Sequence, residues 1–176
     1  ESHHARSELS LEMLENFNPC FVLDLTATPK KESNIISYVD AVQLKNEHMV
    51  KLPVIVYNRD SQSEVLIDAI DLRNKLEEIA SAEYADAEYT KTGKYIRPIA
   101  LFQAQPKGKE DATTFEKLRD KLVDAGIPAE QIAIRTADVN ELKNVELMSP
   151  SCPIRYIITV NALKEGWDCP FAYILA

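Results

Sequence analysis

The sequence has few glycines, cysteines and tryptophans: four, three and one in 176 residues. Cys20, Cys152 and Cys169 are odd in number and show no C-x-x-C spacing, which argues against a zinc site or a disulfide framework. We expect them to be reduced, mostly buried thiols of a cytoplasmic protein. There is no run of eighteen apolar residues, and the first residues lack the basic-then-apolar order of a signal peptide. The sequence therefore predicts a soluble chain that has no membrane partner.

The sequence also lacks an excess of positive charge. Its 20 Lys and Arg stand against 28 Asp and Glu, which gives a net charge of −8. Most of this charge lies between Asp60 and Glu88, where nine acids face only Arg73 and Lys75, a local net charge of −7. Because the rest of the chain is nearly neutral, the total charge does not argue against a local phosphate-binding surface, although no basic stripe indicates one.

The first third of the chain predicts a helix followed by a buried strand. Residues 7–17 carry Leu11, Leu14 and Phe17 at helical spacing, and Asn18-Pro19 ends the pattern. Residues 20–26, C-F-V-L-D-L-T, form the mostly apolar kind of run that parallel sheets bury on both faces. Pro29 and the polar residues after it predict a loop.

The middle of the chain predicts paired strands and then a long helix. The β-rich runs 35–44 and 49–57 flank the polar residues K-N-E-H, which favours a hairpin. Residues 62–89 predict an amphipathic helix whose acids form a solvated face. Its apolar side is expected to comprise Val65, Ile67, Ala69, Ile70, Leu72, Leu76 and Ile79.

Strand and helix alternate in the last part of the chain. Runs 97–104, 131–136 and 154–160 predict strands, and a helix is expected over 113–126, with Gly126 at its end. A short helical turn is expected at 139–144, and the apolar residues 171–176 resemble the start of another strand. This order predicts an α/β fold with a mostly parallel sheet.

Ligands of such sheets gather at the loops that follow the carboxyl ends of the strands. In this sequence those loops are T-A-T-P-K-K at 26–31, Q-A-Q-P-K-G-K at 103–109 and N-A-L-K-E-G-W-D-C-P at 161–170. Each is a weak signal by itself, because polar turns commonly follow strands.

Three motifs occur in a fixed order: E-S-H at 1–3, T-A-T-P at 26–29 and T-V-N-A-L-K-E-G-W-D-C-P at 159–170. This set resembles superfamily 2 helicase and translocase motors, and the residues of its motifs are most similar to those of the restriction subunit of type III restriction enzymes. E-S-H is similar to the tail of the D-E-x-H box, T-A-T-P to the coupling motif, and the third motif to one in the second motor lobe. E-G-W-D-x-P is the most specific part.

The resemblance implies a RecA-like fold. Residues 1–33 would be the end of the first motor lobe, 34–96 a connecting hairpin and acidic helix, and 97–176 an incomplete second lobe with a three-layer αβα arrangement. It also implies that the chain is a fragment, because it has no G-x-x-x-x-G-K-[ST] loop, no aspartate before Glu1 and no arginine-rich motif. The isolated chain is expected to be inactive.

In the first lobe the resemblance implies the chemistry of ATP hydrolysis. Glu1 would be the catalytic carboxylate that polarises water beside the magnesium site, contacting the metal indirectly. His3 would link the nucleotide to the coupling residues Thr26, Ala27 and Thr28, whose hydroxyls both donate and accept hydrogen bonds.

In the second lobe the resemblance implies contacts to both ligands. Gly166 and Asp168 would bind nucleotide, with Asp168 accepting from a ribose hydroxyl, and Thr159 and Asn161 would contact nucleic-acid phosphate. For Trp167, packing and base stacking are equally compatible with the sequence.

The implied protein is a cytoplasmic, ATP-dependent DNA translocase of a restriction endonuclease. It would use ATP and Mg, and its partners would be double-stranded DNA and a modification methyltransferase subunit; in such enzymes a separate nuclease domain cuts the DNA. The alternatives are another superfamily 2 helicase, such as a type I restriction or repair motor, and a non-catalytic α/β interaction module that docks through the acidic helix. A metalloprotein using His3, His4 and His48 is disfavoured, because no acid or cysteine stands at ligand spacing.

Overall fold

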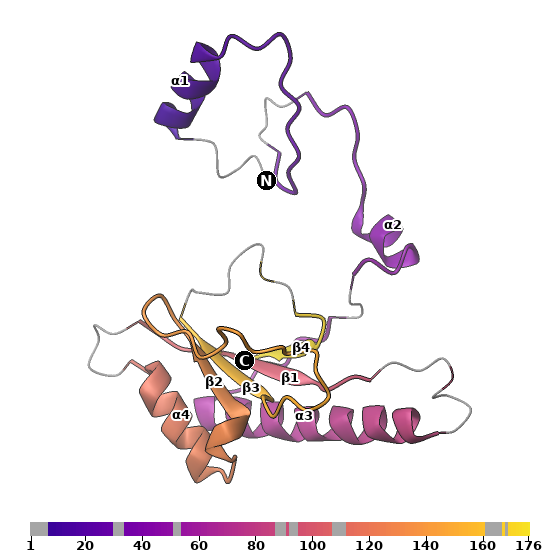
Figure 1. Ribbon diagram of the computed structural model, residues 1–176, viewed down its shortest axis with the longest axis vertical. Coiled ribbons are helices and arrows are strands. Elements are labelled where there is room, and N and C mark those ends of the chain that lie inside the picture. The colour runs from indigo at the N-terminus through magenta and orange to yellow at the C-terminus, as the bar shows by residue number, and fades with distance from the viewer. Residues whose placement is uncertain are drawn as a thin grey trace. The chain divides into compact units, whose positions relative to one another are not determined.

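A computed structural model describes residues 7–29, 34–50, 54–86, 91, 95–106, 112–160, 167 and 169–176 (Figure 1). The chain divides into two units, residues 1–56 and residues 57–176. Within the described ranges, no helix is both long enough and apolar enough to cross a membrane.

The second unit is built on a four-stranded sheet. Its strands are β1 (Ile99–Gln103), β2 (Ile132–Arg135), β3 (Tyr156–Thr159) and β4 (Ala172–Leu175). They lie in the order β2-β3-β1-β4, and every pair of neighbours is parallel. The predicted α/β class with a parallel sheet is therefore confirmed.

Two helices of this unit form near their predicted ranges, 62–89 and 113–126, and the first ends four residues before its predicted end. α3 (Gln62–Ala85) begins at Ser61, whose hydroxyl accepts from the N–H of Glu64 at 3.2 Å. α4 (Phe115–Asp124) connects β1 to β2 and is followed by Gly126, which has a φ of +88°. Such a left-handed conformation strains residues that have a Cβ, so glycine is well suited to end this helix.

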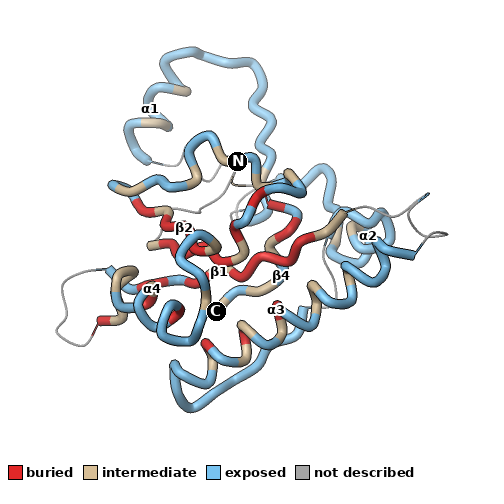
Figure 2. Tube along the Cα trace, turned by 60° about the horizontal axis from the view of Figure 1, so that its bottom comes forward, coloured by how far each residue is buried: buried red, intermediate tan, exposed pale blue. Residues whose placement is uncertain are grey.

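Both helices pack on the same face of the sheet (Figures 1 and 2). Side chains of a strand alternate between the two faces, and in β1, β2 and β3 one alternate set points toward α3 and α4. This apolar cluster consists of Leu66, Ala69, Ala100, Phe102, Ala104, Leu118, Leu122, Ile132, Ile134, Tyr156 and Ile158.

The opposite face is covered by irregular chain. Its cluster consists of Ile99, Ala133, Cys152, Ile154, Ile157, Cys169 and Phe171, with Trp167 and other partly buried residues packed against it. Among the described residues of the second unit, no α-helix contributes to this cluster. Within these residues, the expected three-layer arrangement thus appears as one helical layer, the sheet and a layer of irregular segments.

The predicted apolar side of α3 is partly wrong. Ile67 and Ile79 are 54% and 57% exposed, whereas the buried residues are Leu66, Ala69 and Arg73. Their spacing of three and four residues makes a narrow stripe, because only the face against the sheet is covered. α3 was expected in a connecting segment, but it lies in the second unit and supplies part of its core.

The first unit contains two short helices. α1 (Glu8–Asn16) forms where helical spacing predicts it, and the hydroxyl of Ser7 accepts from the N–H of Ser10 at 3.1 Å. α2 (Ala41–Asn46) replaces the predicted hairpin, which was wrong. A capping box explains the helix: Asp40 Oδ1 accepts from the N–H of Gln43 at 2.8 Å, and Gln43 Oε1 accepts from the N–H of Asp40 at 3.0 Å.

The predicted buried strand at residues 20–26 is also wrong. These residues form neither a helix nor a strand, and Phe21, Leu23 and Leu25 are 73%, 58% and 74% exposed. A central strand requires neighbours that satisfy its N–H and C=O groups and cover both its faces. Among the described residues of the first unit no strand is present, and none of them is buried.

Candidate functional site

The carboxyl ends of three strands carry a row of polar side chains. In the register of the sheet, Thr159 of β3 lies beside Arg135 of β2 on one side and beside Gln103 of β1 on the other. Neighbouring strands are about 4.8 Å apart, so Arg135 and Gln103 are separated by about 10 Å along the row. Thr159, predicted as a ligand residue, therefore occupies the centre of this edge.

The three side chains share one face of the sheet. Gln103, Arg135 and Thr159 each lie two positions after Leu101, Ala133 and Ile157, respectively. Ala133 and Ile157 belong to the cluster on the face opposite α3 and α4, and Leu101 packs against it. Side chains two positions apart in a strand point to the same face. Thr159 is 7% exposed, Arg135 is of intermediate exposure and Gln103 is exposed. The row thus has a buried hydroxyl at its centre, with a guanidinium and an amide more accessible on either side.

The chain after β2 folds back along the outer edge of that strand. Thr136 donates its N–H to Val139 O at 2.8 Å and accepts from the N–H of Val139 on its hydroxyl at 3.0 Å. Glu141 Oε2 accepts from the N–H of Ile134 at 2.7 Å, and the N–H of Glu141 donates to Ile134 O at 3.0 Å. These contacts satisfy backbone groups that an edge strand leaves unpaired, and they hold the end of β2 at Arg135 in place.

The two sides of the segment that follows β1 are also joined. The N–H of Gln105 donates to Thr113 O at 2.9 Å, and Gln105 Oε1 accepts from the N–H of Thr113 at 3.2 Å. The hydroxyl of Thr113 donates to Gln62 Oε1 at 2.7 Å, which ties this point to the first turn of α3. Residues 107–109 of the predicted ligand loop at 103–109 lie outside the described residues.

The third ligand segment is described only near its end. Trp167 packs against the second apolar cluster, where Cys169 and Phe171 are buried, so the packing role left open by the sequence matches the structure. The predicted ligand residues Asn161, Gly166 and Asp168 lie outside the described residues.

Of the predicted site residues in the first unit, the structure describes only the coupling motif, Thr26, Ala27 and Thr28. The hydroxyl of Thr26 accepts from the N–H of Thr28 at 3.1 Å, which closes a small turn around Ala27. Thr26 is of intermediate exposure, and the two residues after it are exposed. The predicted catalytic residues Glu1 and His3 lie outside the described residues.

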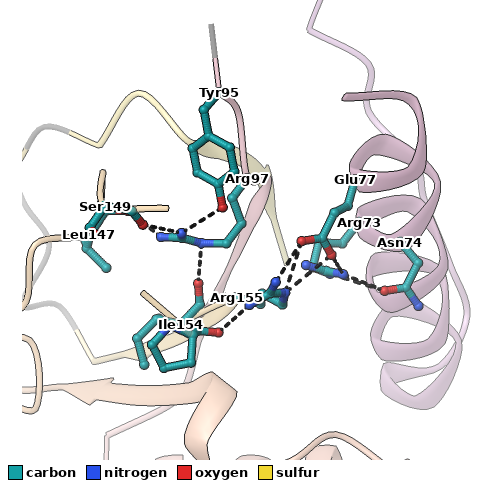
Figure 3. A network of polar contacts seen from close by, with 10 residues as sticks. Arg73, Asn74, Glu77, Tyr95, Arg97, Leu147, Ser149, Ile154 and Arg155 are labelled. Atoms are coloured by element: carbon teal, nitrogen blue, oxygen red, sulfur yellow. Dashed lines mark hydrogen bonds and ion pairs between the residues drawn. The ribbon is translucent and has the colours of Figure 1, made fainter. Parts of the chain in front are cut away.

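A buried arginine at the other end of the sheet was not predicted (Figure 3). Arg97 precedes β1 and is 0% exposed. Its guanidinium carbon lies 5.9 Å from the ring centre of Tyr95 and 5.7 Å from that of Phe171. Its hydrogen-bond acceptors are the carbonyls of Leu147, Ser149 and Ile154 and the hydroxyl of Tyr95. The bonds to the three carbonyls tie the segment before β3 to the amino end of β1.

A second unpredicted network joins α3 to the sheet (Figure 3). Glu77 accepts from Arg73 on the same helix and from Arg155, whose Nη2 lies 3.0 Å from Glu77 Oε1. Burial alone would raise the pKa of Glu77, but hydrogen bonds and charge attraction from the two arginines lower it on balance. The Arg73 guanidinium also lies over the ring of Tyr156, 5.4 Å from its centre. Glu77 is therefore not part of the solvated acidic face that the sequence predicted.

No cluster of three or more metal-ligating His, Cys, Asp or Glu side chains gathers within the described ranges. Of the three histidines, only His48 falls within these ranges.

No protein-family model, curated protein or solved structure matches the chain.

Proposed function

We propose that this chain is part of the ATP-dependent DNA motor of a type III restriction enzyme, in which ATP hydrolysis drives movement along double-stranded DNA. The intact enzyme would use ATP and Mg, and it would act together with a modification methyltransferase subunit. The proposal rests on the order of three motifs in the sequence and on one structural observation. That observation is the position of Thr159, the first residue of the third motif, at the carboxyl end of β3 in an all-parallel sheet.

The position matters because open parallel sheets bind ligands at this edge. β3 is an internal strand with a neighbour on each side, so Thr159 lies between the ends of two other strands. The motif segment leaves the sheet at this point, and Trp167 and Cys169 lie in or against the second apolar cluster at the far end of the segment. The first residue of the third motif thus lies at the edge where open parallel sheets bind their ligands.

The proposal is tested in the intact motor with Asp168→Ala. Loss of a ribose contact is expected to reduce DNA-stimulated ATP hydrolysis by tenfold or more, about 1.4 kcal/mol in the barrier, with an unchanged melting temperature. Asp124→Ala, an exposed aspartate at the end of α4, is the matched control and should hydrolyse ATP at the normal rate. A destabilised Asp168→Ala protein with normal stimulation would contradict the proposal, because Asp168 would then only stabilise a turn.

A further inference from the structure

One arginine of the described chain differs from the others in its partners. Arg135 makes one hydrogen bond within the described residues, from Nη1 to the carbonyl of Thr136 at 2.9 Å, and no ion pair there. Arg97 is buried among carbonyls. The remaining described arginines, Arg59, Arg73, Arg119 and Arg155, each pair with a carboxylate.

This difference is informative because acids outnumber bases in the sequence by eight. Where carboxylates are in excess, an arginine without a carboxylate partner leaves local positive charge at its position. A guanidinium carries five N–H donors in a planar fork, and the contact to Thr136 leaves most of them available. Arg135 is of intermediate exposure, so part of the residue is accessible to solvent.

The position of Arg135 identifies the ligand class that suits it. It lies next to Thr159 in the register and on the same face of the sheet, at the carboxyl edge. On either side of Thr159, the guanidinium of Arg135 offers one charge and the amide of Gln103 offers neutral hydrogen-bond donors to an anion. These groups carry no pattern that distinguishes one base from another, so they suit a phosphate backbone.

We infer that Arg135 contacts a backbone phosphate of double-stranded DNA beside Thr159. This inference rests on the proposed function and adds to it a charged contact that the motif resemblance does not include. The chain as a whole carries net negative charge and repels DNA, so a local cation at the contact edge contributes strongly to binding.

The test measures binding of the full chain to a fluorescent DNA duplex by anisotropy, between about 50 and 200 mM salt. Arg135→Gln is expected to weaken binding about tenfold at the lower salt concentration. It should also make the slope of log affinity against log salt shallower by about 0.9, the value for one phosphate contact. Arg135→Lys should bind with intermediate affinity, because it keeps the charge but loses the planar fork.

Arg119→Gln is the matched control. Arg119 lies on α4 and pairs with Glu141 at 3.4 Å, and its side chain is 36% exposed. Its removal changes the net charge equally but should leave the salt slope unchanged. Melting temperatures of all variants are measured in parallel, to show that each is folded.

The outcomes separate the inference from the proposed function. A wild-type slope for Arg135→Gln, or an equal effect of Arg119→Gln, overturns the inference. If the inference about Arg135 is overturned but Thr159→Val makes the salt slope shallower, the proposed function stands without the Arg135 contact. If the wild-type chain fails to bind duplex DNA, both are overturned. If Arg135→Gln weakens the binding of ATP alone, or of an RNA duplex of the same sequence alone, the assignment to a DNA phosphate is overturned.

Discussion

The run Y-I-I-T of β3 and the run F-V-L-D-L of the first unit have similar apolar character, but only the first is buried. Ile157 and Ile158 are 0% exposed, whereas Leu23 and Leu25 are 58% and 74% exposed. β3 pairs with a strand on each side, and α4 packs against it. Residues 20–26 pair with no strand among the described residues of their unit. Apolar character therefore produces a core only where other elements supply hydrogen-bond partners and cover.

The largest expected difference between the units is in hydrogen exchange. The amides of β1 and β3 should exchange only through opening of the sheet, with protection factors on the order of 10³ or more. The amides of residues 20–25 should exchange nearly as fast as in an unfolded peptide, because they are exposed and lie outside helices and strands. Exchange followed by mass spectrometry checks this. Equal protection of the two regions would show that the first unit has a core after all.

Matched leucine substitutions test the same contrast through stability. Leu122→Ala removes a side chain of α4 that is 0% exposed, and it should lower the free energy of unfolding of the second unit by about 2–5 kcal/mol. Leu25→Ala removes a side chain that is 74% exposed and should change this free energy by less than about 0.5 kcal/mol. Urea titrations monitored by circular dichroism measure both. Comparable losses in the two variants would contradict the contrast.

The Glu77 network predicts a pH dependence that belongs to the second unit. Arg73 and Arg155 hold the pKa of Glu77 below its ordinary value of 4.5, so the folded state favours the charged form. The stabilisation is present above that ordinary value and is lost as the pH falls below it through the lowered pKa of the folded state. Glu77→Gln should flatten this part of the curve of unfolding free energy against pH. Curves of equal slope for wild type and Glu77→Gln would show that the network does not stabilise the fold.

The smallest expected effect comes from two serine caps that make the same local contact. Ser61→Ala removes the cap of α3, which packs on the sheet, and should lower the stability of the second unit by about 1 kcal/mol. Ser7→Ala removes the cap of α1, which has no buried residue, and should leave that stability unchanged. Thermal unfolding of the two variants measures the difference. A loss in Ser7→Ala equal to that in Ser61→Ala would mean that α1 contributes to the same cooperative unit.

Local sequence signals were sufficient for much of the second unit. The strand at 97–104, the helix at 113–126 and the strand at 154–160 were predicted and are present as β1, α4 and β3. Apolar runs and a glycine after the helix define these elements over short distances. In the first unit the same reasoning predicted strands and missed the capping box of α2, because apolar runs resemble strands whether or not a sheet is available.

The candidate site was predicted only in part, for a similar reason. The position of Thr159 at a carboxyl strand end follows from a strand that the sequence reveals. Its neighbours Arg135 and Gln103 depend on the order β2-β3-β1, which pairs segments far apart in the sequence. Arg97 and Glu77 were missed because their acceptors and partners lie on other elements, and a charged residue in a sequence gives no sign of its own burial.

The sequence by itself determined where the helices and strands of the second unit form, the end of α4 at Gly126, and the motif order that suggests a motor. Those features depend on side-chain periodicity and on capping groups within a few residues. The tertiary structure alone decided which apolar runs are buried, which face of α3 packs, and which polar side chains stand beside Thr159. Those properties depend on contacts between distant segments, and only the folded sheet brings those segments together.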